Sequence, residues 1–575
     1  MKKRCNYMSF CFVLVMLWLS TGHLVAASDV CPYCADLGRG CDAQLQRCIP
    51  CNGTSGCSSL QSCNLDTGYC DPKPLFQPFV WNDGILIPFM FLSSAIHNAA
   101  GTGGGTSYIA LFVIVLGFRV AAASANSHAF IFAGMIANVL VNLWARHPFR
   151  DMPRIDWNLV ATTVPLFLAG SSVGVFLNQT FPNYFLSLFL AAIMFLLTVI
   201  VTWLGVRLSW RELARHRRCT RSNLATMDAA TERTDQAEIN TTAKSLEAAP
   251  FDRDEEDVRV DAKEQSLSIV AATELATADD SEQADNTSQE TFSKASAKTQ
   301  TSVDGALQGV WLPRWLDPLL HARTLDEMMQ IERSWFQWRY ILLLASCWSV
   351  LFVARYLSGS RDARSPVGMP LCGAVFWVVF ALQETYLVAV ALLMYWRNRR
   401  LWRLRHTLDF AWYIDANGMG DVPFRDVFLA PYMLFSLFVG VLDTWVGISG
   451  SALLVPYLYI LGRVEPFTVQ SSISTVIFVT SSAGAVQFLA YGQLQISYAL
   501  FYGLWTMLGS FFGVALVYYI ARKYHVKAVF LLALAAACAF SFGTLVYVGI
   551  RNIAHVAAAQ VGWVFNNICA VAYKT

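Results

Sequence analysis

Apolar runs long enough to cross a lipid bilayer recur along the chain, separated by short polar loops. Uninterrupted runs lie near 120–143, 157–178, 183–206, 337–357, 371–396, 466–490, 496–520 and 528–549, and two interrupted runs lie near 85–117 and 427–461. A membrane helix needs about 20 consecutive apolar residues, which each uninterrupted run supplies. The pattern therefore predicts an all-α polytopic membrane protein.

Composition agrees with this pattern and adds little to it. Of 575 residues, 55% are hydrophobic and 14% are charged, whereas soluble domains carry about 25% charged residues. The net charge of +2 is close to neutral, and we expect no nucleic-acid partner. The expected partners are the lipid bilayer, a small anionic substrate and a coupling proton, and composition does not indicate an oligomeric state.

The first interrupted run contains Gly101-Thr-Gly-Gly-Gly105, four glycines in five residues. Each glycine costs roughly 1 kcal/mol relative to alanine inside a helix, so the helix is predicted to break here. A break at membrane depth needs cover from protein or a water-filled cavity. Half-helix ends and bare amides could then bind an anion without a basic side chain. The alternative is a loosely packed crossing of helices through small residues.

A second copy of this motif follows about 346 residues later, at Asp443–Ser451. Aligning Gly101 with Gly447 brings Leu116-Gly117 within one position of Leu461-Gly462. The later segments of each half carry a glycine pair, Gly170-x-x-x-Gly174 in one and Gly509-x-x-x-Gly513 in the other. The chain is therefore predicted to be an internal duplication.

These motifs resemble the sulfite exporter TauE/SafE family, whose two halves each begin with a Gly-x-Gly-Gly-Gly-like break. The resemblance covers residues 84–208 and 427–550. The first motif follows the family pattern, whereas the second carries serines at 449 and 451. The resemblance implies transport of sulfite or of an organosulfur anion such as a sulfonate, while the residues by themselves indicate only a small anion.

The N-terminal region predicts entry into the secretory pathway. Residues 1–27 have the basic start, short apolar core and small-residue cleavage site of a signal peptide. Residues 28–80 contain eight cysteines, predicted to form four disulfides in a small extracytosolic module: Cys31, Cys34, Cys41, Cys48, Cys51, Cys57, Cys63 and Cys70. A zinc ribbon and a redox pair at Cys31-x-x-Cys34 are the weighed alternatives. Asn52 and Asn178 are candidate glycosylation sites.

Arginines set the predicted topology. They fill the loop at 146–154 and follow the run that ends at 206, but the loop at 178–183 has none. By the positive-inside rule the first two segments are cytosolic and the third is extracytosolic. The first broken segment must then enter and leave on the extracytosolic face, as a re-entrant pair of half-helices. The second half starts on the cytosolic face, so the two repeats are predicted to be inverted.

The predicted organisation follows directly. The ranges are 1–27 for the signal peptide, 28–80 for the cysteine-rich module, 84–208 for the first repeat, 209–335 for a largely disordered cytosolic linker, 336–396 for two additional helices, 397–426 for a basic cytosolic loop, 427–550 for the second repeat and 551–575 for a C-terminal tail. The low apolar content of the linker predicts disorder. The basic loop could lie along an anionic leaflet.

The candidate substrate site combines both breaks with polar residues near the starts of the following helices. Its residues are Gly101, Thr102, Gly103, Gly104, Gly105, Asn126, Ser127, Gly447, Ser449, Gly450, Ser451, Ser471 and Ser472. Neutral donors suit a small oxyanion that must be released again. His97 and Asp443, at matched positions, and Glu384, in an additional helix, are candidates for proton coupling. Helix packing for the serines and a structural role for these three remain the alternatives.

The predicted function is secondary transport of a small anion by alternating access, in the plasma membrane or an endomembrane. The rival from another class is a cell-surface sensor in which the cysteine-rich module binds a ligand. No nucleophile–base pair or metal cluster indicates an enzyme, and neither a cofactor nor a metal is expected.

Overall fold

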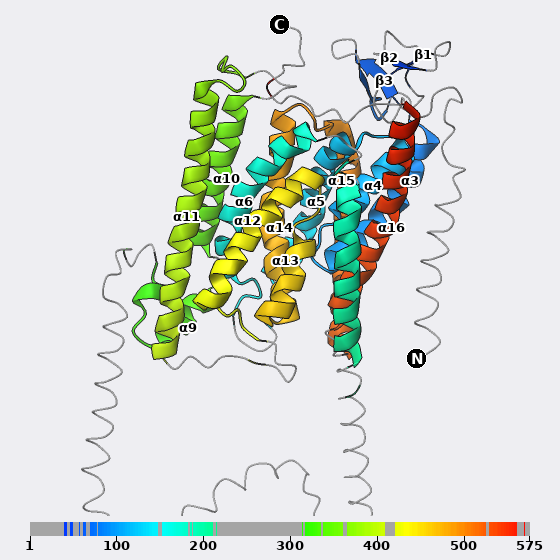
Figure 1. The fold of residues 1–575 in the computed structure, drawn as a ribbon. Helices are drawn as coiled ribbons and strands as arrows, with labels where there is room; N and C mark the ends of the chain where they lie inside the picture. The colour runs from blue at the N-terminus through cyan, green and yellow to red at the C-terminus, as the bar shows by residue number, and fades with distance from the viewer. Residues whose placement is uncertain are drawn as a thin grey trace, which may run out of the picture. The chain divides into compact units, whose positions relative to one another are not determined.

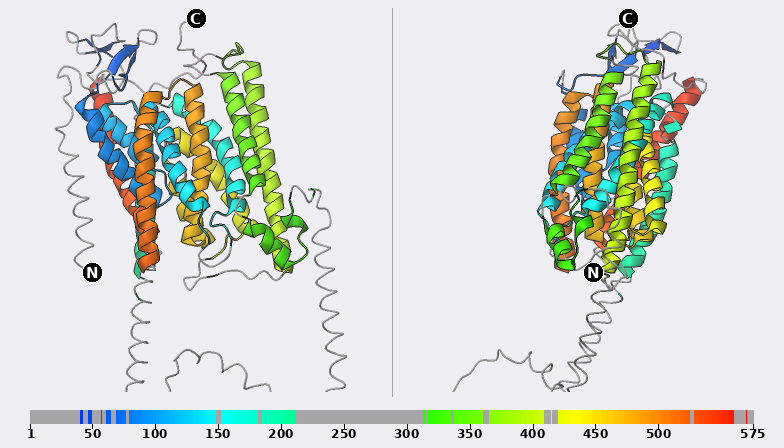
Figure 2. Two further views of the ribbon diagram at one scale, coloured as in Figure 1. Left: turned by 180° about the vertical axis from the view of Figure 1, so that it is seen from behind. Right: turned by 90° about the vertical axis from the view of Figure 1, so that its left-hand side faces the viewer.

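A bundle of long helices makes up the computed structural model (Figures 1 and 2). The structure describes short strands within 40–72 and the ranges 73–147, 152–210, 317–408 and 420–559. Within these ranges it leaves out 77–78, 182–184, 187, 335–336, 360–364 and 525–527. Outside them it describes the single positions 57, 214, 313, 414 and 569. The chain divides into two units, 1–208 with 310–575, and 209–309. The helices and strands named here belong to the first unit; the predicted signal peptide and nearly all of the second unit lie outside the described residues.

Nine helices in the described part of the chain are long and apolar enough to cross a membrane, which supports a mostly helical, multi-pass membrane protein. They are α5 (Val120–Leu143), α6 (Trp157–Thr180), Leu188–Trp210, α10 (Trp338–Ser358), α11 (Ala374–Thr407), α12 (Asp426–Val446), α14 (Pro466–Ala490), α15 (Ile496–Tyr524) and α16 (Ala528–Ala559). The predicted runs agree with these bounds within a few residues, except that α11, α15 and α16 extend further at their C-terminal ends.

Two antiparallel hairpins represent the N-terminal module. β1 (Gly40–Asp42) pairs with β2 (Arg47–Ile49), and β3 (Gln61–Asn64) pairs with β4 (Tyr69–Pro72). Cys41 lies opposite Cys48, and Cys63 lies opposite Cys70. Cys57 and Cys63 each take part in a disulfide. Residues 31, 34, 51 and 52 lie outside the described residues, so the four-disulfide module and glycosylation at Asn52 stay predictions.

The first predicted break is present between α3 (Trp81–Ala99) and α4 (Gly105–Leu116). Gly101, Gly103 and Gly104 have φ angles of 76°, 75° and 81°, a left-handed backbone that residues with a Cβ rarely adopt. The chain then turns back, because the Asn82 amide at the start of α3 donates to the Val115 carbonyl at the end of α4, at 3.0 Å. The segment is therefore a re-entrant pair of half-helices.

The second break separates α12 from the short helix α13 (Ser451–Tyr457), which continues into the π-helical turn η2 (Leu458–Gly462). Gly447 ends α12 with a φ of 80°. The Tyr457 ring lies 5.9 Å from Phe428 in the first turn of α12, so this segment also folds back toward its start. The Asp426 carboxylate at the start of α12 pairs with Arg399 of α11 at 2.9 Å, at the end of the bundle opposite the strands (Figure 1).

Glycine pairs bring helices of the two halves into backbone contact. On α6, a Cβ at Gly170 or Gly174 would overlap the carbonyl oxygens of α12, at Leu437 and Val441. On α15, a Cβ at Gly509 or Gly513 would overlap carbonyl oxygens of α3. Each broken helix is therefore held by the glycine pair of the other half, the small-residue packing typical of membrane helices.

The end of the linker and the basic segment are more ordered than predicted. The predicted disordered linker 209–335 includes η1 (Leu319–His321) and helix α9 (Leu325–Arg333). Residues 397–407 continue α11 rather than forming a loop on the membrane surface. Arg397 pairs with Asp317 and Arg405 pairs with Glu332, and all four side chains are buried. These ion pairs explain the difference, because buried arginines need nearby carboxylates.

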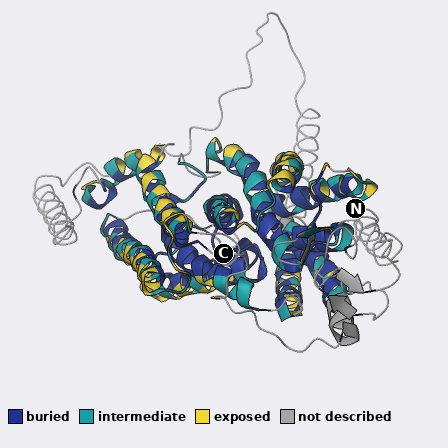
Figure 3. Ribbon diagram, turned by 90° about the horizontal axis from the view of Figure 1, so that it is seen from above, coloured by how far each residue is buried: buried dark blue, intermediate teal, exposed yellow. Residues whose placement is uncertain are grey.

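Burial follows the pattern expected of a protein surrounded by lipid. Seen from above, exposed positions lie on the outward faces of the helices and buried positions lie between them (Figure 3). Large apolar side chains are exposed, among them Leu382, Leu392, Leu500 and Phe511. Polar side chains such as Asn98, Ser107 and Gln470 are buried instead. The apolar exterior around an interior that also holds polar groups fits a hydrocarbon environment.

A disulfide between Cys372 and Cys569, 197 residues apart, ties the α10–α11 connection to the C-terminal tail. Such bonds persist in oxidising compartments. The predicted cytosolic segments before α10 and after 396 imply an extracytosolic α10–α11 connection, and on that expectation Cys569 lies on the same face.

Removing Cys569 should expose the thiol of Cys372. We expect Cys569→Ser to react stoichiometrically at Cys372 with a membrane-impermeant maleimide applied from the extracytosolic side. The wild-type protein should react there only after reduction. Mass spectrometry of the labelled peptide checks both statements, with the buried Cys347 as the unreactive internal control. Labelling of Cys372 in the unreduced wild type would contradict the bond.

Candidate functional site

The two breaks lie against each other in the centre of the bundle. A Cβ at Gly103 would lie 2.9 Å from the Ser449 hydroxyl, and one at Gly105 would lie 3.1 Å from the Gly447 carbonyl oxygen. Glycine is required at Gly103 both for its positive φ and for this close approach. The structure therefore brings together the two motifs that the sequence placed 346 residues apart.

A small cavity of about 10 Å³ lies where the breaks meet. Thr102, Gly104 and Thr106 line it from the first break, and Ser449 lines it from the second. The remaining lining comes from His97, Ala452, Met194, Leu534, Ala537, Cys538 and Ser541. This volume holds about one water molecule, so the conformation is closed around the site.

Backbone amides at the first break are available to a ligand. The amides of Gly101 and Thr102 donate to the carbonyls of Asn98 and His97, which continue the last turn of α3. Within the described residues, the amides of Gly103 and Gly104 have no acceptor at hydrogen-bonding distance. They precede α4, in which the amides of Ser107 and Tyr108 donate to the Gly104 carbonyl at 3.1 Å, whereas those of Gly105 and Thr106 have no backbone acceptor in the described part of the chain. This is the arrangement that binds anions at helix N-termini.

His97 connects the first break to α16 through hydroxyl groups. Its Nδ1 lies 2.8 Å from the Ser93 carbonyl oxygen and therefore donates to it. Its Nε2 lies 3.0 Å from the Ser107 hydroxyl and 3.3 Å from that of Ser541. Thr106 also donates to Ser541, at 2.7 Å. A neutral His97 thus accepts at Nε2, and a change in its protonation would reverse the direction of these hydrogen bonds.

Asp443 organises the second break. Its carboxylate accepts the Gly450 amide at 2.9 Å, which fixes the turn before α13. The Ser449 and Ser451 hydroxyls lie 2.9 Å apart on the same turn. His97 and Asp443 therefore have no hydrogen-bond partner in common, and the partners of each residue lie within or beside its own break. The geometry supports a structural role for Asp443, and proton coupling by this pair stays a prediction.

The other predicted site residues lie away from the cavity. The Ser127 hydroxyl donates to the Ser124 carbonyl within α5. The Asn126 side chain accepts the Gln495 amide, in the α14–α15 connection, at 3.2 Å. At the opposite end, the Ser472 hydroxyl accepts the Asp156 amide, in the α5–α6 connection, at 2.8 Å, and that of Ser471 donates to the Arg154 carbonyl. These four residues hold helices and loops in place.

Two more predicted residues have partners that bear on their roles. Glu384 is partly buried and accepts the Gln383 amide at 3.1 Å. Asn178 is 3% exposed within the last turn of α6, and its amide donates to the Trp445 carbonyl at 2.8 Å. Because a glycan would need this nitrogen, glycosylation at Asn178 requires the end of α6 to open.

Sequence reasoning did not identify Ser541, Cys538 and Met194 as lining residues. Ser541 is completely buried and bonds to three polar residues of the first re-entrant segment. The available signal was the polar pair Ser541 and Thr544 in the otherwise apolar helix α16. Cys538 and Met194 gave no signal, because apolar positions of membrane helices resemble one another.

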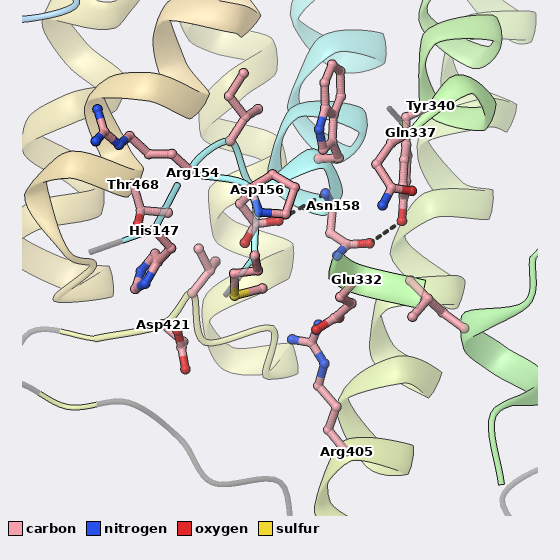
Figure 4. A pocket seen from close by; sticks show the side chains of 16 residues that line it. His147, Arg154, Asp156, Asn158, Glu332, Gln337, Tyr340, Arg405, Asp421 and Thr468 are labelled. Atoms are coloured by element: carbon pink, nitrogen blue, oxygen red, sulfur yellow. Dashed lines mark hydrogen bonds and ion pairs between the residues drawn. The ribbon is translucent and has the colours of Figure 1, made fainter. Parts of the chain in front are cut away.

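A larger cavity of about 70 Å³ lies at the end of the bundle opposite the strands (Figure 4). Asp156 lies in its lining, where its carboxylate caps α6 by accepting the amides of Asn158 and Leu159 at 3.0 and 3.1 Å. Arg405 and Glu332 lie below it, with Asp421 and His147 to one side (Figure 4). Burial raises the pKa of Asp156 to about 6, with Glu332 and Asp421 adding to the rise and Arg405 opposing it.

Replacing Asp156 by asparagine should stabilise the protein near neutral pH. Because its pKa is raised from 3.8 to about 6, the folded state holds this proton more tightly than the unfolded state, so its contribution to stability falls as pH rises from about 4 to 6. Asparagine keeps the capping oxygen without the charge. We expect a gain of about 1–2 kcal/mol at pH 7.5, allowing for partial exposure, and none at pH 4. Thermal unfolding in detergent that shows lower stability at pH 7.5 would contradict this.

Comparisons with known proteins agree with the resemblance. Residues 367–540 match the sequence model of the family described as "Sulfite exporter TauE/SafE". The chain is 22% identical over 466 residues to "Sulfite exporter TauE/SafE family protein 1" of Arabidopsis thaliana, covering 80% of this chain and 83% of the relative. It is 23% identical over 461 residues to family protein 5 of the same plant, covering 79% and 78%. No solved structure is significantly similar to the chain.

Proposed function

Because this chain belongs to the sulfite exporter TauE/SafE family, we propose that it is a secondary transporter that moves a small oxyanion across its membrane at the junction of the two breaks. Sulfite and sulfonates are the substrates to test first, since the relatives are named as sulfite exporters.

The contact between the two breaks carries this proposal. Gly104, whose amide has no acceptor within the described residues, lines a cavity together with Thr106, Ser449 and Ser541. Within the described residues, the lining contains no lysine or arginine. An anion held by neutral donors is recognised and can still leave, because no fixed opposite charge retains it.

Reciprocal contacts between the halves support alternating access. Gly101 packs on Gln470 and Ser474 of α14, while Gly447 packs on Ser124 of α5. Asn126 of the first half holds the α14–α15 connection, and Ser472, 346 positions later, holds the α5–α6 connection. The breaks are also approached from opposite ends of the bundle (Figure 1). An inverted repeat would produce this exchange of equivalent contacts, and rocking one half against the other would expose the site to each side.

Binding requires the closed conformation to open. The cavity of about 10 Å³ has room for one water molecule, and sulfite has four heavy atoms. Met194, Leu534 and Cys538 are apolar side chains of the lining whose movement would enlarge the space without breaking hydrogen bonds of the helix breaks. Proton coupling through His97 belongs to the same proposal, since protonation would add a cation beside the anion.

A flux measurement in proteoliposomes tests the proposal. The initial rates of labelled sulfite, sulfate and a sulfonate identify the substrate. Ser541→Ala should lower the rate for the preferred anion about 5- to 10-fold, the factor expected for loss of one hydrogen bond of about 1 kcal/mol. Ser482→Ala is the matched control, because Ser482 bonds to Trp348 on the outer side of α14. Equal rates for wild type, Ser541→Ala and empty liposomes would reject transport through this site.

A further inference from the structure

Arg355 is a buried cation without a carboxylate partner. It lies in the last turn of α10, is 2% exposed, and its guanidinium lies 4.7 Å from the Phe176 ring and 5.0 Å from the Phe380 ring. Its Nη1 donates to the Tyr491 hydroxyl at 3.4 Å. Within the described residues its Nε and Nη2 groups have no acceptor. Glu384 is close enough to attract it, but forms no ion pair with it.

The unused groups of Arg355 form one edge of the guanidinium. Nε–H and one Nη2–H point in parallel and match two oxygens of an oxyanion. Arg397 in the same chain shows this use, because its Nε and Nη2 both donate to the carboxylate of Asp317. In each of the four described ion pairs, the arginine or lysine side chain has a carboxylate partner. Arg355 instead lies against two aromatic rings, and its Nε and Nη2 groups have no acceptor within the described residues.

Further unpaired polar groups lie on the neighbouring helices. Gln487, one turn before Tyr491 on α14, is completely buried, and neither atom of its amide has a partner in the described part of the chain. His128 of α5 is 1% exposed, stacks on Phe488 at 5.3 Å, and has both ring nitrogens unpaired. Unpaired buried polar groups are costly, and in membrane segments they mark the pathways of ions.

We propose that Arg355 forms a second anion-binding site, at the extracytosolic end of the bundle, which holds a small oxyanion through two oxygens on its Nε and Nη2 edge. We assign Arg355 to the extracytosolic end because the α10–α11 connection, which follows it, is expected on that face and carries the Cys372–Cys569 disulfide. Phe176 and Phe380 fix the plane of the guanidinium, and Gln487, one turn before Tyr491, offers an unpaired buried amide on α14. The identity of the anion as sulfite or a sulfonate rests on the proposed function, but the site itself does not.

Anion binding to the full-length protein in detergent tests the site. Titration with sulfite should show two binding events in the wild type. In both Arg355→Gln and Arg355→Lys one event should weaken about 10- to 100-fold, the factor for loss of charged hydrogen bonds. Lysine keeps the positive charge but lacks the paired Nε and Nη2 donors. Chloride needs only the charge, so in Arg355→Lys chloride should still compete with sulfite for this position. Arg339→Gln, at the other end of α10, is the control, and thermal unfolding verifies that each variant is folded.

The outcomes separate this inference from the proposed function. Ser541→Ala should weaken the other event and leave the Arg355 event unchanged. Glu384→Gln should not weaken the Arg355 event; if it weakens it as much as Arg355→Gln does, Arg355 pairs with Glu384 instead and the proposal is wrong. Unchanged binding in either folded Arg355 variant also overturns it, even if Ser541→Ala still impairs transport. Loss of both events in Arg355→Lys at wild-type stability would contradict two separate sites.

Discussion

Replacing Gly513 by leucine should abolish the assembled protein. Even a Cβ at this position would overlap the Ala95 carbonyl oxygen of α3, and Gly509 meets the carbonyl of Phe91 in the same way. Overpacking a core costs about 1–3 kcal/mol when side chains can shift, and here the obstacle is backbone on both helices. Since a whole domain is stable by only about 5–15 kcal/mol, separation of α15 from α3 is the expected result. Yield of monodisperse protein after detergent extraction measures it.

The symmetrical substitution Gly174→Leu should have an effect of similar size, because a Cβ there would overlap the Val441 carbonyl oxygen of α12. Gly549→Ala on α16 is the matched control. A Cβ at Gly549 meets nothing within 4 Å, so alanine should be neutral or slightly stabilising through helix propensity. Normal yield of Gly513→Leu would show that α15 and α3 do not pack as described.

The helices could be predicted from the sequence because lipid imposes simple requirements. A span needs an apolar run of a certain length, and α5 and α14 begin and end at the predicted residues. The glycine breaks were also predictable, since four glycines in five residues cannot continue a helix. The glycine pairs were recognised as a shared feature of the two halves, but their packing against the broken helix of the other half needed the structure.

The composition of the site was less predictable because it depends on contacts between distant segments. Ser541 contacts Thr106 across 435 positions, and one serine in an apolar helix does not indicate such a contact. Asn126 and Ser472 are polar and follow the breaks, so the sequence suggested ligands where the structure has loop anchors. The α11 extension was missed because Arg397 and Arg405 suggested a basic cytosolic loop at the membrane surface, whereas Asp317 and Glu332 of the linker pair with them.

Gly103→Ala should reduce transport more than any other small substitution at the breaks. The new methyl group would lie 2.8 Å from the Ile131 side chain and 2.9 Å from the Ser449 hydroxyl, on a backbone with φ of 75°. It would therefore push the two breaks apart and cover the amides that the anion needs. We expect a loss of at least about 100-fold in the rate of sulfite flux, since a shift of even 1 Å in such a site has that effect.

The double variant Gly103→Ala/Ser449→Gly separates contact between the breaks from general damage. Glycine at 449 removes the hydroxyl that the new methyl group meets, so the breaks can approach again. Flux should recover by about tenfold over the single variant, although the backbone strain at position 103 and the contact with Ile131 remain. Ser449→Gly by itself should lose only the few-fold that one neutral hydrogen bond provides. If the double variant transports no better than Gly103→Ala at equal expression, the two breaks do not act on the anion together, and the site must be assigned to the first break alone.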